Sequence, residues 1–414
     1  MTRPTAVSLH VGAMIDVQAI CQWLVEGAPG ANDPASVVGR MCDDLVIAGM
    51  PIERVGAFIR TLHPYIMGRR FMWAPGKPVQ VAEASYAILR TPEFQKSPVA
   101  FVMETGQTFR RHLVKNPPAP TETVVGPLAL EGFTDYLAVP LKFMGGDVHA
   151  ITFSTRVPEG FTDEQIAALQ RVTVPLSRLA EIMALRRTAA NLLNTYVGHD
   201  AGERILAGKI QLGDTEKIHA VLWFSDLRGF TALSGSIEPD ALIHTLNEVF
   251  DCQVTAIQRH GGEVLKFIGD GLLAIFPTAK STDADVCNRA LDAADAAFKA
   301  LDALNAKRTE RGDAPVRFGL ALHIGDVAYG NIGGAGRLDF TCIGTAVNLA
   351  ARLESLTGQL KRDIVVSSSF AALTNRHTES IGAFTLKGVT NPEIVYAPLL
   401  APTLPSVVSS LQNA

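Results

Sequence analysis

The chain's clearest hydrophobic pattern is an apolar run at residues 221–224 that ends near a carboxylate, Asp226, before a turn at Gly229. Such a run predicts a buried strand that delivers Asp226 to its C-terminal edge. Two later apolar runs flank Gly269 and Asp270, which predicts a hairpin with Asp270 at its tip. If the two strands are neighbours, both carboxylates meet at one sheet edge. Taken alone, each aspartate fits a turn residue that caps backbone amides better than it fits a metal ligand.

The surrounding pattern predicts an α+β domain. A helix over 239–260 has its apolar residues on one face and stops at a pair of glycines, and an alanine-rich helix covers 283–307. A strand follows at 316–323. The order strand, helix, hairpin, helix, strand is the ferredoxin-like βαββαβ pattern. Beyond it we expect a helix that carries Asn348 and Arg352, and a strand at 364–366.

The first 160 residues have a different pattern. Residues 1–16 are expected to be loose, and 20–62 read as helical, with one helix through Leu45 and another opened by Pro51. A strand at 68–73, a proline-rich loop at 115–120 and a hairpin formed by 135–141 and 149–154 come next. Thr162 and Gln165 then have the spacing of a capping box, which predicts the start of a helix.

The helix that starts at Thr162 is long. Its apolar residues recur at a spacing of three to four up to Met183 and continue at Leu193. Pro175 lies within it and predicts a kink or a break. The helix fits a signal-carrying dimer helix that feeds the region after it, or an amphipathic helix packed on its own domain. We favour the first interpretation, because the helix leads directly into the region of the two aspartates.

Composition excludes several classes of protein. Hydrophobic residues make up 47% of the chain and charged residues 19%, which suits a globular protein. The net charge of −4 argues against a nucleic-acid-binding surface. No apolar run is long enough for a transmembrane segment, and the N-terminus lacks the features of a signal peptide. The five cysteines are scattered, which indicates free thiols in a reducing cytoplasm. His63, His112 and His149 fit ordinary surface or core histidines better than ligand contacts.

Three motifs now point to a family. They are Phe-Ser-Asp-Leu-Arg-Gly-Phe at 224–230, Lys-Phe-Ile-Gly-Asp at 266–270, and Gly-Thr-Ala-Val-Asn-Leu-Ala-Ala-Arg at 344–352. In this order they resemble the catalytic domain of class III nucleotidyl cyclases, over about residues 215–400. The hairpin and helix opening near 160 resemble the C-terminal half of a GAF sensor domain, and an unrelated α+β sensor fits them equally well. We therefore expect a sensor-like domain at 1–160, a helical connector at 161–214, the cyclase domain at 215–400 and a tail at 401–414.

The resemblance implies roles for the site residues. Asp226 and Asp270 would bind two Mg²⁺ or Mn²⁺ ions per site, which agrees with the preference of hard cations for oxygen ligands. Asn348 would orient the ribose, and Arg352 would hold the α-phosphate. These two lie four apart on one face of the predicted helix. An alternative partner for Arg352 is the nearby Glu354.

Base choice follows from two further positions. The resemblance assigns purine contact to Lys266 and Thr341. In the family, a Lys at the first position paired with Thr or Asp at the second is associated with ATP. A Glu paired with a Cys is associated with GTP. Cys342 lies one residue beyond the cysteine position of the GTP pattern. A lysine can donate to adenine N1, whereas guanine presents a donor there. Lys387 would reach the terminal phosphates, although lysines are more often simply solvated.

The sequence therefore predicts a cytoplasmic, homodimeric adenylate cyclase with sites shared between two chains, regulated through its N-terminal domain by a ligand or partner that the sequence does not identify. The alternatives are a non-catalytic nucleotide-binding regulatory protein on the same fold, or a guanylate cyclase. A diguanylate cyclase is disfavoured, because residues 261–264 read Gly-Gly-Glu-Val instead of that family's Gly-Gly-Asp/Glu-Glu-Phe.

Overall fold

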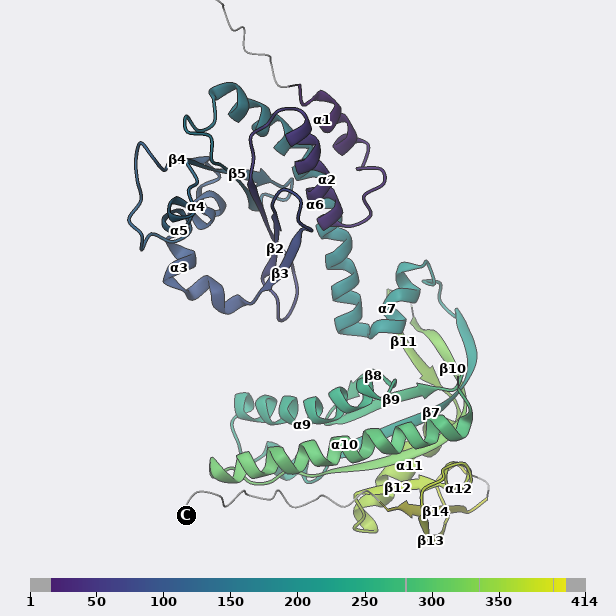
Figure 1. Cartoon of the computed structure of the whole chain (residues 1–414). Helices are drawn as coiled ribbons and strands as arrows, with labels where there is room; N and C mark the ends of the chain where they lie inside the picture. Colours follow the sequence, from purple (N-terminus) through teal and green to yellow (C-terminus); the bar gives the residue numbers. More distant parts are fainter. Residues whose placement is uncertain (1–15, 280, 335, 390, 400–414) are drawn as a thin grey trace, which may run out of the picture. The chain divides into compact units, whose positions relative to one another are not determined.

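A computed structural model describes residues 16–279, 281–334, 336–389 and 391–399 (Figure 1). The chain divides into two compact units, one up to Leu192 and one from Leu193 onward. Helix α6, Asp163–Val197, starts in the first unit and ends in the second. The predicted loose start and C-terminal tail lie, apart from Asp16, outside the described residues. The predicted domain boundaries at 160, 214 and 400 stay predictions.

The first unit is built on a six-stranded antiparallel sheet in the order β3-β2-β1-β6-β5-β4. Its strands are β1 Arg54–Arg60, β2 Gly68–Trp73, β3 Gln80–Ala84, β4 Phe109–His112, β5 Asp135–Lys142 and β6 Val148–Thr155. Its helices besides α6 are α1 Gln18–Val25, α2 Pro34–Ile47, α3 Pro92–Gln95, α4 Pro98–Thr105 and α5 Val125–Leu130, with a 3₁₀ turn at Tyr86–Arg90.

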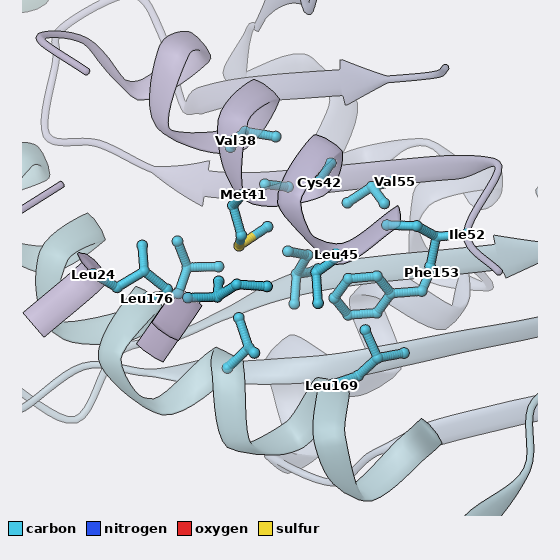
Figure 2. Close-up of a cluster of buried hydrophobic side chains, with 14 of the residues drawn as sticks. Leu24, Val38, Met41, Cys42, Leu45, Ile52, Val55, Phe153, Leu169 and Leu176 are labelled. Carbon is cyan, nitrogen blue, oxygen red and sulfur yellow. The ribbon is translucent and has the colours of Figure 1, made fainter. Parts of the chain in front are cut away.

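Both faces of this sheet are covered, because successive side chains of a strand point to opposite faces. One face packs against α1, α2 and α6, and Figure 2 shows Leu24, Met41, Leu45 and Phe153 converging in that core. The other face forms a smaller core with α4 and α5, to which Tyr136 contributes. The sheet with helices on both sides makes this unit α+β, and its GAF-like assignment stays a prediction.

Several local predictions for this unit are confirmed. The hairpin of β5 and β6, the strand β2 and the loop at 115–120 are present. The capping box also forms, because the Thr162 N–H donates to the Gln165 side-chain oxygen at 2.9 Å and the Gln165 N–H donates to the Thr162 hydroxyl at 3.2 Å. These predictions rested on turn and cap chemistry, which acts over a few residues.

The helical prediction for 20–62 was wrong after α2, because residues 54–60 form strand β1. The helical spacing of Val55, Phe58 and Leu62 is coincidental. Val55 is buried in the larger core, Phe58 packs on the opposite face, and Leu62 is exposed. Period-2 placement across a two-sided sheet explains this better than a helix does.

The long helix also differs from the dimer helix that we favoured from the sequence. Helix α6 is continuous through Pro175, so the predicted break is absent. Leu169, Val172 and Leu176 are buried in the first unit's core, and Met183 packs against it. The apolar residues in the N-terminal half of α6 therefore pack on their own domain, as the alternative of an amphipathic helix predicted. Exposed apolar residues also occur along the helix, among them Val174, Leu185 and Tyr196.

The second unit contains a mixed sheet in the order β13-β14-β12-β10-β7-β9-β8, with β11 paired to β10. The strands are β7 Thr215–Leu227, β8 Glu263–Ile268, β9 Gly271–Pro277, β10 Phe318–Gly334, β11 Arg337–Ile343, β12 Ile364–Ser367, β13 Thr378–Phe384 and β14 Glu393–Pro398. The helices are α7 His199–Leu206, α8 Phe230–Ser234, α9 Pro239–Arg259, α10 Asp283–Glu310, α11 Thr345–Gln359 and α12 Ser368–Ala371.

The ferredoxin-like prediction is confirmed. The order β7, α9, β8, β9, α10, β10 along the chain gives four antiparallel strands arranged β10-β7-β9-β8 (Figure 1). Side chains of β7 alternate between two cores. Val221 and Trp223 pack with α9 and α10, whereas Ala220 and Leu222 pack with α7 and α11. None of the described helices combines the length and apolarity that a bilayer crossing needs.

Candidate active site

Asp226 and Asp270 lie together at one end of the central strands. Asp226 is opposite Gly271 in the β7–β9 ladder, and Asp270 lies in the turn between β8 and β9. The two carboxyl groups are within hydrogen-bonding range of each other, and this contact disfavours the ionised form of Asp226. Burial, and then the charge of Asp270, raise the pKa of Asp226 to about 6. The structure thus brings together the two aspartates, whose role as metal ligands stays a prediction.

At Gly271 the backbone beside this pair has no room for a larger residue. A Cβ at Gly271 would lie 2.8 Å from the Ser225 carbonyl oxygen and 3.0 Å from Asp226 Oδ1. Gly269, at φ +64°, forms the turn that carries Asp270. Glycine therefore allows the hairpin to approach β7 closely enough to place the carboxylates side by side. Paired carboxylates of like charge suit a hard divalent cation that completes its coordination with water and phosphate oxygens.

A third carboxylate near the pair was not predicted as a site residue. Burial, and next the charge of Asp226, raise the pKa of Glu354 to about 7, while Arg228 opposes this shift. Thr357 donates a hydrogen bond to Glu354 Oε1 at 3.3 Å. Glu354 follows Arg352 by two residues, which places it on a different face of α11. That two-residue spacing could already have shown from the sequence that Glu354 does not pair with Arg352.

Arg352 and Asn348 lie on the exposed side of α11, whose opposite side is buried through Ala350 and Leu353. Within the described ranges, no carboxylate oxygen comes within 4.0 Å of the Arg352 guanidinium. The alternative pairing of Arg352 with Glu354 is therefore not present. The four-residue spacing does place Asn348 and Arg352 on the same side of the helix, where both are open to a ligand.

Lys266 and Thr341 are positioned by β8 and β11. Lys266 lies near enough to Cys342 for its charge to act on the thiol. Burial raises the pKa of the Cys342 thiol to about 11, and the positive charge of Lys266 opposes this shift. Thr341 immediately precedes Cys342 and is 3% exposed. Its hydroxyl is buried and has no hydrogen-bond partner in the described part of the chain. A buried hydroxyl without a partner is costly and marks a place where a ligand can bind.

Lys387 lies at the other side of the sheet from the β8–β9 hairpin. It is an exposed residue in the turn between β13 and β14. The preceding Leu386 is buried and its carbonyl accepts a hydrogen bond from the Val389 N–H at 3.0 Å, which fixes the turn. The structure therefore gives Lys387 a defined backbone but does not bring it to Asp226 and Asp270.

Comparison with known proteins identifies this unit. Residues 214–397 match the model of the adenylate and guanylate cyclase catalytic domain. An adenylate cyclase of Anabaena cylindrica is 30% identical over 239 residues, which cover 55% of this chain and 45% of that protein. Adenylate cyclase 1 of Rhizobium meliloti is 26% identical over 266 residues, which cover 61% of this chain and 39% of that protein.

The chain thus spans less than half the length of these two relatives. Among solved structures, the adenylyl cyclase CyaB of P. aeruginosa is 26% identical, with a TM-score of 0.40, and the match covers 45% of this chain and 97% of that one. The segment 214–397 belongs to the family of adenylate and guanylate cyclase catalytic domains.

Proposed function

We propose that the protein is an adenylate cyclase that converts ATP to 3′,5′-cyclic AMP and pyrophosphate. The observation that carries this proposal is the combination of the adjacent carboxylates Asp226 and Asp270 with the buried, unpartnered hydroxyl of Thr341 beside the strand of Lys266. The names of the two curated relatives agree with ATP as substrate.

Asp226 and Asp270 are the residues that would hold two Mg²⁺ or Mn²⁺ ions. Bound there, the ions would supply Lewis-acid activation of the ribose 3′-hydroxyl and charge neutralisation on the leaving phosphates. The like-charge repulsion that raises the pKa of Asp226 would be relieved by such ions. The residues present therefore fit the cofactor that the family implies.

The α11 residues would position the substrate. Arg352 presents a guanidinium that no carboxylate within 4.0 Å neutralises in the described ranges, so it can donate two hydrogen bonds to the α-phosphate as charge builds there. Asn348, one turn earlier, would hold the ribose. Lys387 would contact the terminal phosphates of the nucleotide when its turn closes toward the site.

Lys266 and Thr341 would read the base. The Lys266 ammonium donates to an unprotonated adenine N1, and the Thr341 hydroxyl can accept from the adenine amino group. Guanine would present an N–H to the ammonium, which is unfavourable. Satisfying the buried Thr341 hydroxyl would contribute to discrimination, because a wrong base leaves it unpaired.

A second copy of the chain would complete each site. Phe267, Ile268 and Ile343 are 53%, 43% and 50% exposed and lie beside Lys266 and Thr341 in sequence. Apolar residues grouped around recognition residues favour burial in a homodimer, since a two-fold interface uses the same patch on both chains. Asp226 and Asp270 of one chain would then face Lys266, Thr341, Asn348 and Arg352 of the other.

The proposal includes a cytoplasmic signalling role in which the first unit regulates the cyclase. All five cysteines are free, which fits a reducing compartment. The competing functions are guanylate cyclase and non-catalytic nucleotide binding. Incubation of the pure protein with ATP or GTP and with Mg²⁺ or Mn²⁺, followed by product identification, separates the three. Cyclic GMP as main product, or binding without turnover under all conditions, would overturn the proposal.

A further inference from the structure

The first unit holds a cavity of about 540 Å³ between its sheet and helices α3–α5. This volume lies within the range of about 300–1,000 Å³ typical of small-molecule sites. The floor of the cavity is formed by small side chains on adjacent strands, among them Gly68, Ala82, Ala84 and Thr152. Phe58, Phe94 and Met103 supply apolar walls. The cavity results from small residues on one sheet face, where larger ones would have filled the core.

One buried polar atom in this cavity has no partner. Tyr136 lines the cavity and is 2% exposed, and its hydroxyl makes no hydrogen bond within the described ranges. The Thr152 hydroxyl lies near it and donates its own proton to the Gly56 carbonyl oxygen at 3.3 Å. A buried phenol normally finds a partner, because leaving a buried polar group without one is costly. The Tyr136 hydroxyl is therefore placed to bond a molecule in the cavity.

The charges around the cavity favour an anion. Four arginines line it, and two of them are neutralised. Arg54 pairs with Glu131 and Arg69 pairs with Glu83. The other two, Arg60 and Arg70, have no carboxylate oxygen within 4.0 Å among the described residues, and Glu93 is the one remaining acidic side chain in the lining.

We propose that this cavity binds a small organic anion, with an apolar body against Phe58, Phe94 and Met103 and an anionic group held by Arg70. The Tyr136 hydroxyl bonds a polar atom of the same molecule. The site belongs to the first unit alone, so the proposal stands independently of the cyclase activity proposed for the second unit.

The test uses the full chain and the fluorescent probe 8-anilinonaphthalene-1-sulfonate, which has an aromatic body and one sulfonate. We expect saturable binding at one site per chain. Octanoate should displace the probe at least tenfold more effectively than octanol, which has the same chain without the charge. Non-saturating binding, or equal displacement by the two competitors, would overturn the proposal.

Three variants locate the binding. Arg70→Gln should weaken octanoate about tenfold and leave octanol unchanged, whereas Lys77→Gln, the same charge change in the exposed β2–β3 turn, should have no effect. Tyr136→Phe should weaken the probe without lowering the thermal midpoint, since the lost hydroxyl had no partner. Ala82→Trp should block the cavity. If probe binding survives unchanged in Arg70→Gln and Ala82→Trp, the binding site is elsewhere and the proposal fails, whatever the stability of Tyr136→Phe.

Discussion

Asp226 lies opposite Gly271 across the β7–β9 ladder, and its carboxyl group is therefore next to that of Asp270 in the adjoining turn. Burial, and then repulsion by the charge of Asp270, raise the pKa of Asp226 to about 6. A fold that retains such a pair loses stability at neutral pH when no cation is present. A cation bound at the proposed metal site would offset this repulsion.

Asp226→Asn should separate folding from function. Without metal, the variant should be more stable than the wild type at pH 8 by about 1–2 kcal/mol, a figure reduced for solvent screening of this half-buried group. Mn²⁺ should raise the thermal midpoint of the wild type but not of the variant, and cyclase turnover should be lost. A variant that keeps wild-type turnover at saturating Mn²⁺ would show that Asp226 is not a ligand.

The same pair predicts a pH dependence. The folded-state pKa of about 6 for Asp226 lies above the unfolded value, so folding takes up a proton and metal-free stability falls as pH rises from about 4 to 6. Glu354, with a pKa of about 7, extends this fall to about pH 7. Metal binding requires the carboxylate form and should strengthen over the same range.

Thermal unfolding with and without Mn²⁺ between pH 5 and 8 measures both effects. The stabilisation by Mn²⁺ should grow with pH and level off above about pH 7. In Glu354→Gln, the stability of the metal-free protein should no longer fall between pH 6 and 7. Stabilisation by Mn²⁺ that does not change across this range would contradict the ionisation assigned to Asp226.

How far the sequence predicted the structure depended on the range of the interactions. The β8–β9 hairpin and the capping box of Thr162 depend on neighbours within a few residues, and both were predicted correctly. Strand β1 was taken for a helix, because a strand covered on both faces carries apolar residues at many positions and loses its period-2 signal. The apolar residues of α6, among them Leu176, were taken for a dimer interface. The sequence does not reveal whether a second chain or the helix's own domain covers such a row of apolar residues.

The site followed the same rule. Motif order placed Asp226 and Asp270 at one edge, but the approach of Glu354 arises from the packing of α11 against the sheet. Likewise, the pairing of Thr341 with Gly330 of β10 follows a register that sequence spacing does not specify.

Base choice is testable at the two positions near β11. Lys266→Glu combined with Thr341→Cys should lower the ratio of kcat/KM for ATP to that for GTP, because a carboxylate accepts from guanine N1–H and N2–H. Thr341→Ser is the matched control. It retains the hydroxyl and should retain ATP preference. A ratio that stays at the wild-type value in the double variant would mean that these side chains do not contact the base.

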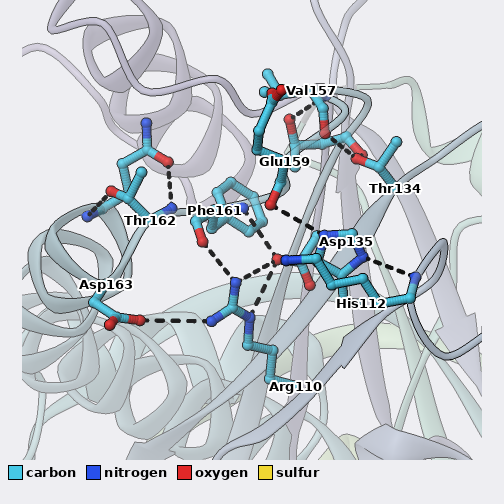
Figure 3. Close-up of polar contacts among 12 residues, drawn as sticks. Arg110, His112, Thr134, Asp135, Val157, Glu159, Phe161, Thr162 and Asp163 are labelled. Carbon is cyan, nitrogen blue, oxygen red and sulfur yellow. Dashed lines mark hydrogen bonds and ion pairs between the residues drawn. The ribbon is translucent and has the colours of Figure 1, made fainter.

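A buried ion pair should stabilise the first unit. Arg110 Nη2 donates to Asp135 Oδ2 at 2.8 Å and to the Phe161 carbonyl at 2.6 Å, at the start of α6, and Asp135 is fully buried (Figure 3). Arg110→Met leaves that carboxylate unpaired and should cost about 2–3 kcal/mol in urea unfolding. Arg111→Met, which breaks the more exposed pair with Glu122, should cost clearly less. Equal effects would show that burial of Asp135 does not matter.

The shared site can be tested by complementation. Asp226→Ala removes a group from one side of each proposed composite site, and Arg352→Ala removes a group from the other side. Each variant homodimer should be inactive, because both of its sites lack a needed residue. In a mixed dimer, one site collects both defects and the other is intact. With random pairing of equal amounts, about half the dimers are mixed and each has one good site, so roughly a quarter of wild-type activity should return.

The measurement is cyclic AMP formation after the two variants are co-expressed or mixed and allowed to exchange. Pairing Asp226→Ala with Asp270→Ala is the matched control. Both changes fall on the same side of the site, so each site of the mixed dimer lacks one carboxylate and no activity should return. A site contained within one chain also predicts no recovery for Asp226→Ala with Arg352→Ala. If labelled subunits exchange and that pair still remains inactive, the composite homodimer site must be abandoned, while the metal role of Asp226 would rest on its own test.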